Sequence, residues 1–158
     1  MALDPSGLCK VEVVYFPIRL PGLGFKTGKY HAAVVVSNNT GGPPNPWIYR
    51  GGPGPGGTYW TPNLAGTAVP FNDPSNPDPP SQVAKSQTLL DDGSDCKCIT
   101  SALDNYYSRV NNSNIPYHLP STNSNAFASG AVGATGLQLP APPVPVPGWG
   151  TPLPVKGP

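Results

Sequence analysis

Two residues of this chain, His31 and Ser124, are of the types that act together as base and nucleophile in acyl transfer. An imidazole takes up protons near neutral pH, and a serine hydroxyl attacks an acyl group when such a base removes its proton. Ser124 stands where a helix is predicted to begin, and the free N–H groups and dipole of a helix N-terminus favour negative charge. His31 stands in an apolar run that predicts a rigid strand. The two residues therefore form a candidate catalytic pair, with the backbone N–H groups of residues 124 and 125 as oxyanion donors.

Both residues also have ordinary structural explanations, which define a second hypothesis. A histidine in an apolar strand can be a hydrogen-bonded core residue, and Asn or Ser at a helix start is a preferred N-cap. On this interpretation the chain is a binding or structural module, and Ser124 has no chemical role. The two hypotheses differ in one geometric respect, because catalysis requires Ser124 and His31 to meet in an open cleft.

The hydrophobic pattern predicts strands followed by helices. Runs of β-branched and aromatic residues predict strands over 10–17, 30–36, 46–51 and 83–90. Apolar residues at helical spacing predict one helix over 96–110, with Ser94 or Asp95 as N-cap, and a second over 123–136. We therefore expect an α+β fold in which an antiparallel sheet of about four or more strands packs against two helices.

Proline and glycine divide the chain into regions. The 158 residues include 24 Pro and 19 Gly; of these 43, 19 lie in 41–80 and 11 in 138–158. We expect one domain over 10–137, preceded by a linker over 1–9 and containing an irregular Gly/Pro-rich loop over 51–81. The Pro-rich tail over 138–158 is expected to pack on the domain as an extended strap anchored by Trp149.

Charge and cysteine content argue against several classes of function. The formal net charge is only +1, whereas a nucleic-acid surface needs a basic face. We see no apolar run of the roughly 20 residues that a membrane span requires, and no signal peptide. Three cysteines are too few for a disulfide framework, and the cysteines and histidines are too scattered for a structural metal. We therefore expect no cofactor and no metal.

Short motifs resemble those of the circularly permuted branch of the NlpC-type papain-like hydrolases, which includes lecithin:retinol acyltransferase-like proteins and bacterial amidases. The Tyr30-His31 strand comes first, Pro116-Tyr117 follows a helix, and Asn123-Ser124-Asn125-Ala126-Phe127 occupies the place of the nucleophile motif. The Gly/Pro-rich segment after YRGGP and the closing PGWGTPL also look like those of bacterial polymorphic-toxin and secretion-effector domains. The resemblance spans residues 10–155.

This resemblance implies roles for further residues. The family nucleophile is a cysteine, so Ser124 is a replacement that needs strong help from a base such as His31. A third polar residue should orient the imidazole, and Asn45 is the candidate for it. Supporting roles fall to Asn123, Asn125 and Tyr117.

A rival nucleophile is Cys96, because SDCKCITSAL looks like the helix start of unpermuted members. His118 would then be its partner. The structural alternative is that Cys96 and Cys98 are helix cysteines, at least one of which faces the core.

The function that the resemblance implies is an amide or ester hydrolase or acyltransferase. Its setting would be a bacterial toxin or secretion effector, exported as part of a larger protein or held in the cytoplasm before delivery. Its substrates would be peptidoglycan peptides or lipid esters, and its partner a cognate immunity protein. The alternative is a catalytically inactive binding module on the same fold.

Overall fold

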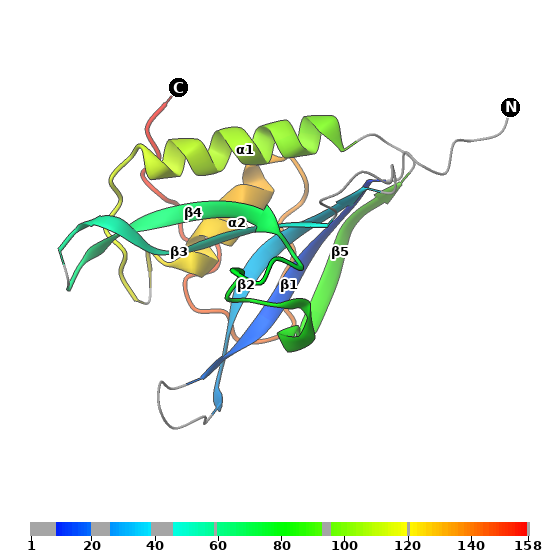
Figure 1. The fold of residues 1–158 in the computed structure, drawn as a ribbon, viewed down its shortest axis with the longest axis horizontal. Helices are drawn as coiled ribbons and strands as arrows, with labels where there is room; N and C mark the ends of the chain where they lie inside the picture. The colour runs from blue at the N-terminus through cyan, green and yellow to red at the C-terminus, as the bar shows by residue number, and fades with distance from the viewer. Residues whose placement is uncertain are drawn as a thin grey trace, which may run out of the picture.

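The computed structural model describes residues 9–19, 26–38, 46–58, 60–92, 96–119 and 121–157, and the structural statements below concern these residues. One antiparallel sheet of five strands carries two helices, which confirms the predicted α+β fold. The strand order is β4-β3-β2-β1-β5 (Figure 1). In chain order the elements are β1 (Cys9–Arg19), β2 (Lys26–Asn38), β3 (Trp47–Gly57), β4 (Pro62–Pro70), β5 (Lys85–Asp92), α1 (Lys97–Asn111) and α2 (Ser124–Ala134).

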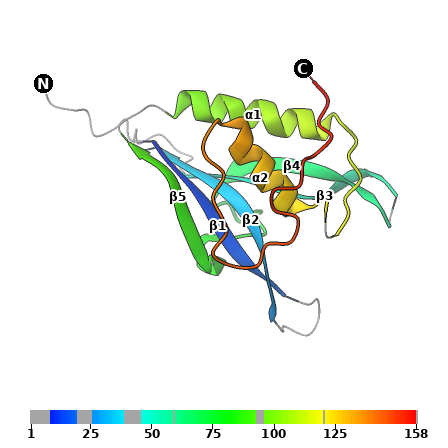
Figure 2. The ribbon, with the colours of Figure 1, turned by 180° about the vertical axis from the view of Figure 1, so that it is seen from behind.

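The sheet buries apolar side chains on both faces. Alternate residues of β1 and β2 point to opposite sides, so the run AAVVV contributes to two cores. Ala32, Val34 and Val36 pack with α1 and α2, on the face that both helices cover. Ala33 and Val35 pack on the other face, with Phe71 and Val83 from the segment between β4 and β5. Figures 1 and 2 show the two helices on one side of the sheet and this segment on the other.

The strands β2 and β3 are paired over only a short stretch. Their register joins Val36 to Trp47, Val35 to Ile48 and Val34 to Tyr49. The pairing of β2 with β1, in contrast, continues along the strand to Tyr30 and beyond. Past Val34 the two strands part, and Figure 1 shows β3 and β4 leading away from β1 and β2. The sheet therefore opens beside His31.

Two glycines let α2 lie close to the sheet. A Cβ atom at Gly51 would stand 2.6 Å from Phe127 Cβ, and one at Gly66 would stand 2.5 Å from Phe127 Cε2. The glycines of α2 itself do not permit this approach. Gly130 instead faces Tyr106 of α1, and Gly133 has open space around it. Strand glycines therefore make room for the aromatic ring of the helix.

The expected irregular loop over 51–81 is wrong in its first part, because β3 runs through Gly57 and β4 covers most of 62–70. Proline removes a donor from a strand, so a Pro-rich run is unfavourable only where both edges are paired. The β3 edge beyond Tyr49 has lost β2, and Pro53 and Pro55 are tolerated there. The irregular segment is limited to residues 71–84, which include a 3₁₀ turn over Pro80–Gln82.

Residues 137–157 form a strap over the helical face of the sheet (Figure 2). Val144, Val146 and Trp149 pack against the core, and the Trp149 ring lies 6.3 Å from that of Tyr15. Trp149 Nε1 also donates to the Pro140 carbonyl at 3.1 Å. The strap therefore has both apolar and polar anchors on the domain.

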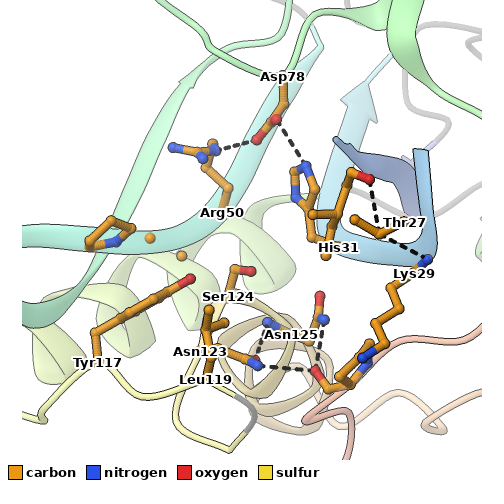
Figure 3. A pocket seen from close by; sticks show the side chains of 15 residues that line it. Thr27, Lys29, His31, Arg50, Asp78, Tyr117, Leu119, Asn123, Ser124 and Asn125 are labelled. Atoms are coloured by element: carbon orange, nitrogen blue, oxygen red, sulfur yellow. Dashed lines mark hydrogen bonds and ion pairs between the residues drawn. The ribbon is translucent and has the colours of Figure 1, made fainter. Parts of the chain in front are cut away.

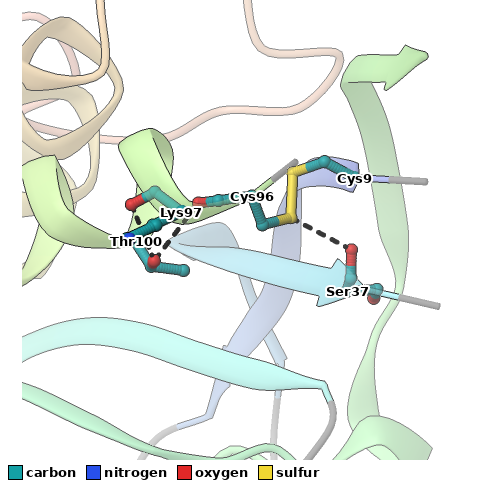
Figure 4. Close-up of a disulfide and its surroundings, with 5 residues drawn as sticks. All are labelled: Cys9, Ser37, Cys96, Lys97 and Thr100. Carbon is teal, nitrogen blue, oxygen red and sulfur yellow. Dashed lines mark hydrogen bonds between the residues drawn. A yellow bond between two sulfur atoms is a disulfide. The ribbon is translucent and has the colours of Figure 1, made fainter. Parts of the chain in front are cut away.

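A disulfide joins Cys9, the first residue of β1, to Cys96, which directly precedes α1 (Figure 4). Both residues are buried, whereas Cys98 is exposed and free. Cys9, which we had included in the linker expected over 1–9, thus belongs to β1, and the cysteine count did not lead us to expect this pairing of Cys9 with Cys96. Their sequence separation of 87 residues concealed the pairing, because only the folded sheet brings them together. The expected caps, Ser94 and Asp95, lie outside the described residues.

We predict that Cys9→Ser lowers the free energy of unfolding by about 2 to 5 kcal/mol, because the disulfide closes a long loop in the unfolded chain. Cys98→Ser is the matched control and should leave the stability unchanged within about 0.5 kcal/mol. Urea unfolding at neutral pH measures both values. Thiol titration of the native protein should find one reactive group, at Cys98; three reactive thiols would contradict the pairing.

Candidate active site

A pocket of about 540 Å³ lies where β2 and β3 part, beside the N-terminus of α2 (Figure 3). It contains five of the residues that were selected from the sequence: His31, Ser124, Asn123, Asn125 and Tyr117. Asn45 lies outside the described residues. The remaining lining comes from β1, β2, β3, the segment after β4, the segment before α2 and the strap: Ile18, Thr27, Lys29, Arg50, Gly51, Gly52, Pro53, Asp78, Leu119 and Pro147.

His31 reaches this pocket from the face of the sheet opposite α2. Its ring stacks on Phe16, with centroids 5.1 Å apart, and Phe16 belongs to the core on that face. A neighbouring strand would normally separate such a side chain from a helix on the other face, but β3 has turned away here. The opening of the sheet therefore lets His31 and Ser124 line one pocket.

Asp78 orients the imidazole, a role that we had expected of Asn45. Its Oδ1 lies 3.2 Å from His31 Nε2, and the Asp78 side chain is only 8% exposed. Burial raises the pKa of the Asp78 carboxyl, but the hydrogen bond and charge of His31, together with Arg50, outweigh it and hold the pKa below its usual range. Asp78 is thus a carboxylate at neutral pH, which accepts a hydrogen bond from the Nε2–H of His31 and leaves Nδ1 as the basic nitrogen.

One local feature of the sequence points to an ordered turn at Asp78. Asn76 is buried and donates to the backbone carbonyls of Phe71 and Asp78, while its own Oδ1 accepts from the Asp78 N–H at 3.1 Å. The pattern Asn-Pro-Asp thus marks an ordered turn rather than a plain surface loop. Nothing in that pattern shows which strand the turn covers, so the contact with His31 depends on the tertiary fold.

Ser124 is the first residue of α2, and Asn123 is the N-cap. Asn123 Oδ1 accepts from the N–H groups of Asn125 and Ala126, at 2.9 and 3.1 Å. The N–H of residue 125, which we had expected to serve as an oxyanion donor, is therefore already occupied by the cap. The N–H of residue 124 donates to the Tyr117 phenol oxygen.

Tyr117 lies against Ser124 at the start of the helix. Burial raises the pKa of the Tyr117 phenol, and hydrogen bonds with the side chain and backbone of Ser124, together with the Arg50 charge, offset part of this increase. In Figure 3 the Ser124 hydroxyl lies between Tyr117 and His31. The arrangement places the Ser124 hydroxyl between a phenol, which can donate a proton, and an imidazole, which can accept one.

Asn125 joins the start of α2 to the strand that carries His31. Its Oδ1 accepts from the Ala32 N–H at 2.7 Å, and its Nδ2 donates to the Tyr30 carbonyl at 3.2 Å. It also donates to Pro147 of the strap at 2.8 Å. The β2 edge that β3 has left is completed in this way by one buried amide. Asn125 thus holds the backbone on both sides of His31 in place relative to Ser124.

The rival site at Cys96 is contradicted, because its sulfur is in the disulfide and cannot act as a nucleophile. His118, its expected partner, is exposed, and its backbone N–H donates to the Thr122 carbonyl. The cysteines of this region are therefore structural at Cys96 and exposed at Cys98. Among the described residues, no three His, Cys, Asp or Glu side chains are grouped as a metal site would require.

We predict that Asn125→Ala lowers the free energy of unfolding by about 3 kcal/mol, since it removes three hydrogen bonds and leaves buried backbone groups of β2 without a partner. Ser124→Ala is the control, and should cost at most about 1 kcal/mol because Ser124 is not the capping residue. Thermal or urea unfolding of the two variants measures the difference. Equal stability of both variants would show that Asn125 does not join the helix to the strand.

The lowered pKa of Asp78 predicts an acid-dependent loss of stability. A carboxyl with a lower pKa in the folded chain stabilises it above the unfolded-state pKa, which is about 4, and this contribution is lost as the pH falls through the folded value. The stability of the wild type should therefore fall relative to that of Asp78→Asn below pH about 4. Urea unfolding at a series of pH values tests this, and a constant difference down to pH about 2 would contradict it.

Neither described helix has the length and apolar character needed to span a bilayer. No family model, curated protein or solved structure matches the sequence or fold.

Proposed function

We propose that this protein is a serine hydrolase or acyltransferase of papain-like geometry that acts on an amide or ester. One observation carries the proposal: a single pocket is lined by Ser124 at a helix N-terminus and by His31, whose Nε2 is held by the buried Asp78 carboxylate. These are the three roles of nucleophile, base and orienting acid. His31 and Ser124 line one pocket although 93 positions separate them.

The reaction follows from the placement of these groups. His31 Nδ1 takes the proton of Ser124 Oγ as the oxygen attacks the carbonyl carbon of the substrate. The Tyr117 hydroxyl then donates to the oxyanion, and the dipole at the N-terminus of α2 favours its negative charge. The C–N or C–O bond breaks, the leaving group takes the proton from His31, and an acyl group remains on Ser124. Water or an acceptor hydroxyl gives its proton to His31 and attacks the acyl carbon. The bond between that carbon and Ser124 Oγ then breaks, and His31 returns the proton to Oγ, which releases the product and restores Ser124.

The proposal includes kinship with the permuted NlpC-type hydrolases. The order of His strand before nucleophile helix supports it, as does the position of Tyr117 beside Ser124. The orienting acid differs from the expected pattern, because it comes from the segment after β4 and not from the strand after the His strand. Within this proposal the substrate is a peptidoglycan peptide or a lipid ester, and the setting is a bacterial effector with a cognate immunity protein.

The pocket lining agrees with such an acyl substrate. Ile18, Leu119, Pro53 and Pro147 offer apolar surface, while Asp78, paired with Arg50, contacts His31. Concave sites with apolar walls and a few convergent polar groups are typical of small-molecule and acyl substrates.

A fluorophosphonate probe tests the proposal, because it phosphonylates only activated serines. We expect the wild type to be labelled at Ser124, as located by peptide mass spectrometry, and we expect no labelling of Ser124→Ala. His31→Ala should lower the labelling rate by about 10²- to 10⁴-fold, the usual range for a general base. Ser129→Ala, a buried serine of the same helix outside the pocket, is the matched control and should be labelled like the wild type.

Ser124→Cys tests whether the geometry is papain-like. The variant places a thiol at a helix N-terminus beside His31, where thiolate is favoured. We expect iodoacetamide to alkylate this introduced thiol faster than the exposed Cys98 of the same chain. If residue 124 reacts with neither probe in either form, the pair is not catalytic and the chain is better described as a binding module.

A further inference from the structure

We propose that Arg50 is a positioning residue of this site, acting through Asp78 to hold His31. The inference rests on the proposed function for its kinetic consequence, but the contacts that support it do not depend on the reaction. Arg50 Nε lies 2.5 Å from Asp78 Oδ2, while the other carboxylate oxygen, Oδ1, lies 3.2 Å from His31 Nε2. The three side chains thus form a chain of contacts from β3 to β2 (Figure 3).

Hydrogen bonds with Asn76 hold the backbone of Asp78, but they do not fix the orientation of its carboxylate. Asn76 holds the Asp78 N–H and carbonyl, which leaves the side-chain torsions free. A carboxylate is fixed in orientation when each of its oxygens has its own partner. Arg50 supplies the partner for Oδ2, so that Oδ1 is directed to the imidazole.

Arg50 is suited to this task by its position on a paired strand. It stands opposite Thr67 of β4, within the continuous register that joins β3 to β4. Its guanidinium lies over Gly52, where an added Cβ would meet the terminal nitrogens at 3.7 and 3.8 Å. Arg50, the donor that orients the Asp78 carboxylate, is therefore held by its place in the sheet.

Because both side chains are largely buried, the Asp78 carboxylate depends on its pairing with Arg50. The Asp78 side chain is 8% exposed and that of Arg50 is 21% exposed, so solvent screens the pair only weakly. A buried carboxylate that loses its cation is an uncompensated charge, which is strongly unfavourable. Without Arg50, Asp78 would rotate toward solvent or take up a proton, and in either case it would no longer hold His31 as a carboxylate.

The alternative role for Arg50 is contact with substrate, since it lines the pocket with Lys29. A residue that acts through Asp78 should affect the chemical step and leave substrate binding unchanged. A residue that binds substrate should raise KM. The two roles therefore differ in measurable ways.

A double-mutant cycle with Arg50→Met, Asp78→Ala and the double variant tests the inference, with fluorophosphonate labelling and ester hydrolysis as readouts. We expect Arg50→Met to lower kcat by about 10- to 100-fold, as is usual when a residue supporting a catalytic group is lost, with KM unchanged. The double variant should be no slower than Asp78→Ala, because Arg50 has no effect once Asp78 is absent. Additive losses, or a rise in KM alone, would overturn the proposal. Should Arg50→Met fail to fold, Arg50→Lys replaces it in the same cycle, with a smaller expected loss.

A second measurement is independent of activity. The His31 Nε2 proton should give an imidazole N–H resonance protected from exchange with water in the wild type, assigned through its ¹⁵N shift. We expect Asp78→Ala and Arg50→Met both to abolish this resonance. Its persistence in Arg50→Met would overturn the role of Arg50. If the wild type shows the resonance but no probe labels Ser124, the proposed reaction fails while the positioning role stands.

Discussion

The parting of β2 from β3 is the constraint on which the rest of the site depends. A continuous sheet would place His31 on one face and the start of α2 on the other, with a strand between them. Because the two strands separate after Val34 and Tyr49, the sheet has an opening at the point where α2 begins. The unpaired edges so created must find other partners, since exposed strand edges are unfavourable and prone to wrong pairing. Asn125, the strap and the segment around Asp78 occupy this space.

The partners that fill the opening come from three distant parts of the chain. The side-chain amide of Asn125 forms hydrogen bonds with the backbone at the edge of β2, and the Pro145 carbonyl accepts from the Tyr30 N–H at 2.9 Å. The outer edge of β4 is covered in a similar way, as Asn111 exchanges two hydrogen bonds with the backbone of Gly66. Each of these asparagine side chains thus bonds to a strand edge as a peptide group of a neighbouring strand would, through one donor and one acceptor.

Much of the fold could be predicted from the sequence, because apolar periodicity and β-branched runs report local structure. Both helices lie within a few residues of the expected positions, and the run AAVVV forms a buried strand as expected. The site was predictable in part: His31 and Ser124 could be selected by type and by position at element boundaries. Asp78 could not, because its role depends on which face of the sheet its segment covers. The strand over Gly51–Gly57 was also missed, since its glycines and prolines are disfavoured in strands except where an edge is open. The Cys9–Cys96 disulfide was missed because cysteine number and spacing say little about pairing across 87 residues.

The strap has a consequence for the order in which the molecule is built. Asn123 and Asn125 both donate to the carbonyl of Pro147, which follows them by more than 20 residues, and Tyr30 donates to Pro145. Synthesis proceeds from the N-terminus, so the sheet and both helices leave the ribosome before these carbonyls do. During that interval the edge of β2 beside His31 lacks one of its acceptors, and the amides of Asn123 and Asn125 lack a common partner. The candidate site is thus completed last, and a nascent chain that has not yet released Pro147 carries the residues of the pocket without the arrangement that aligns them.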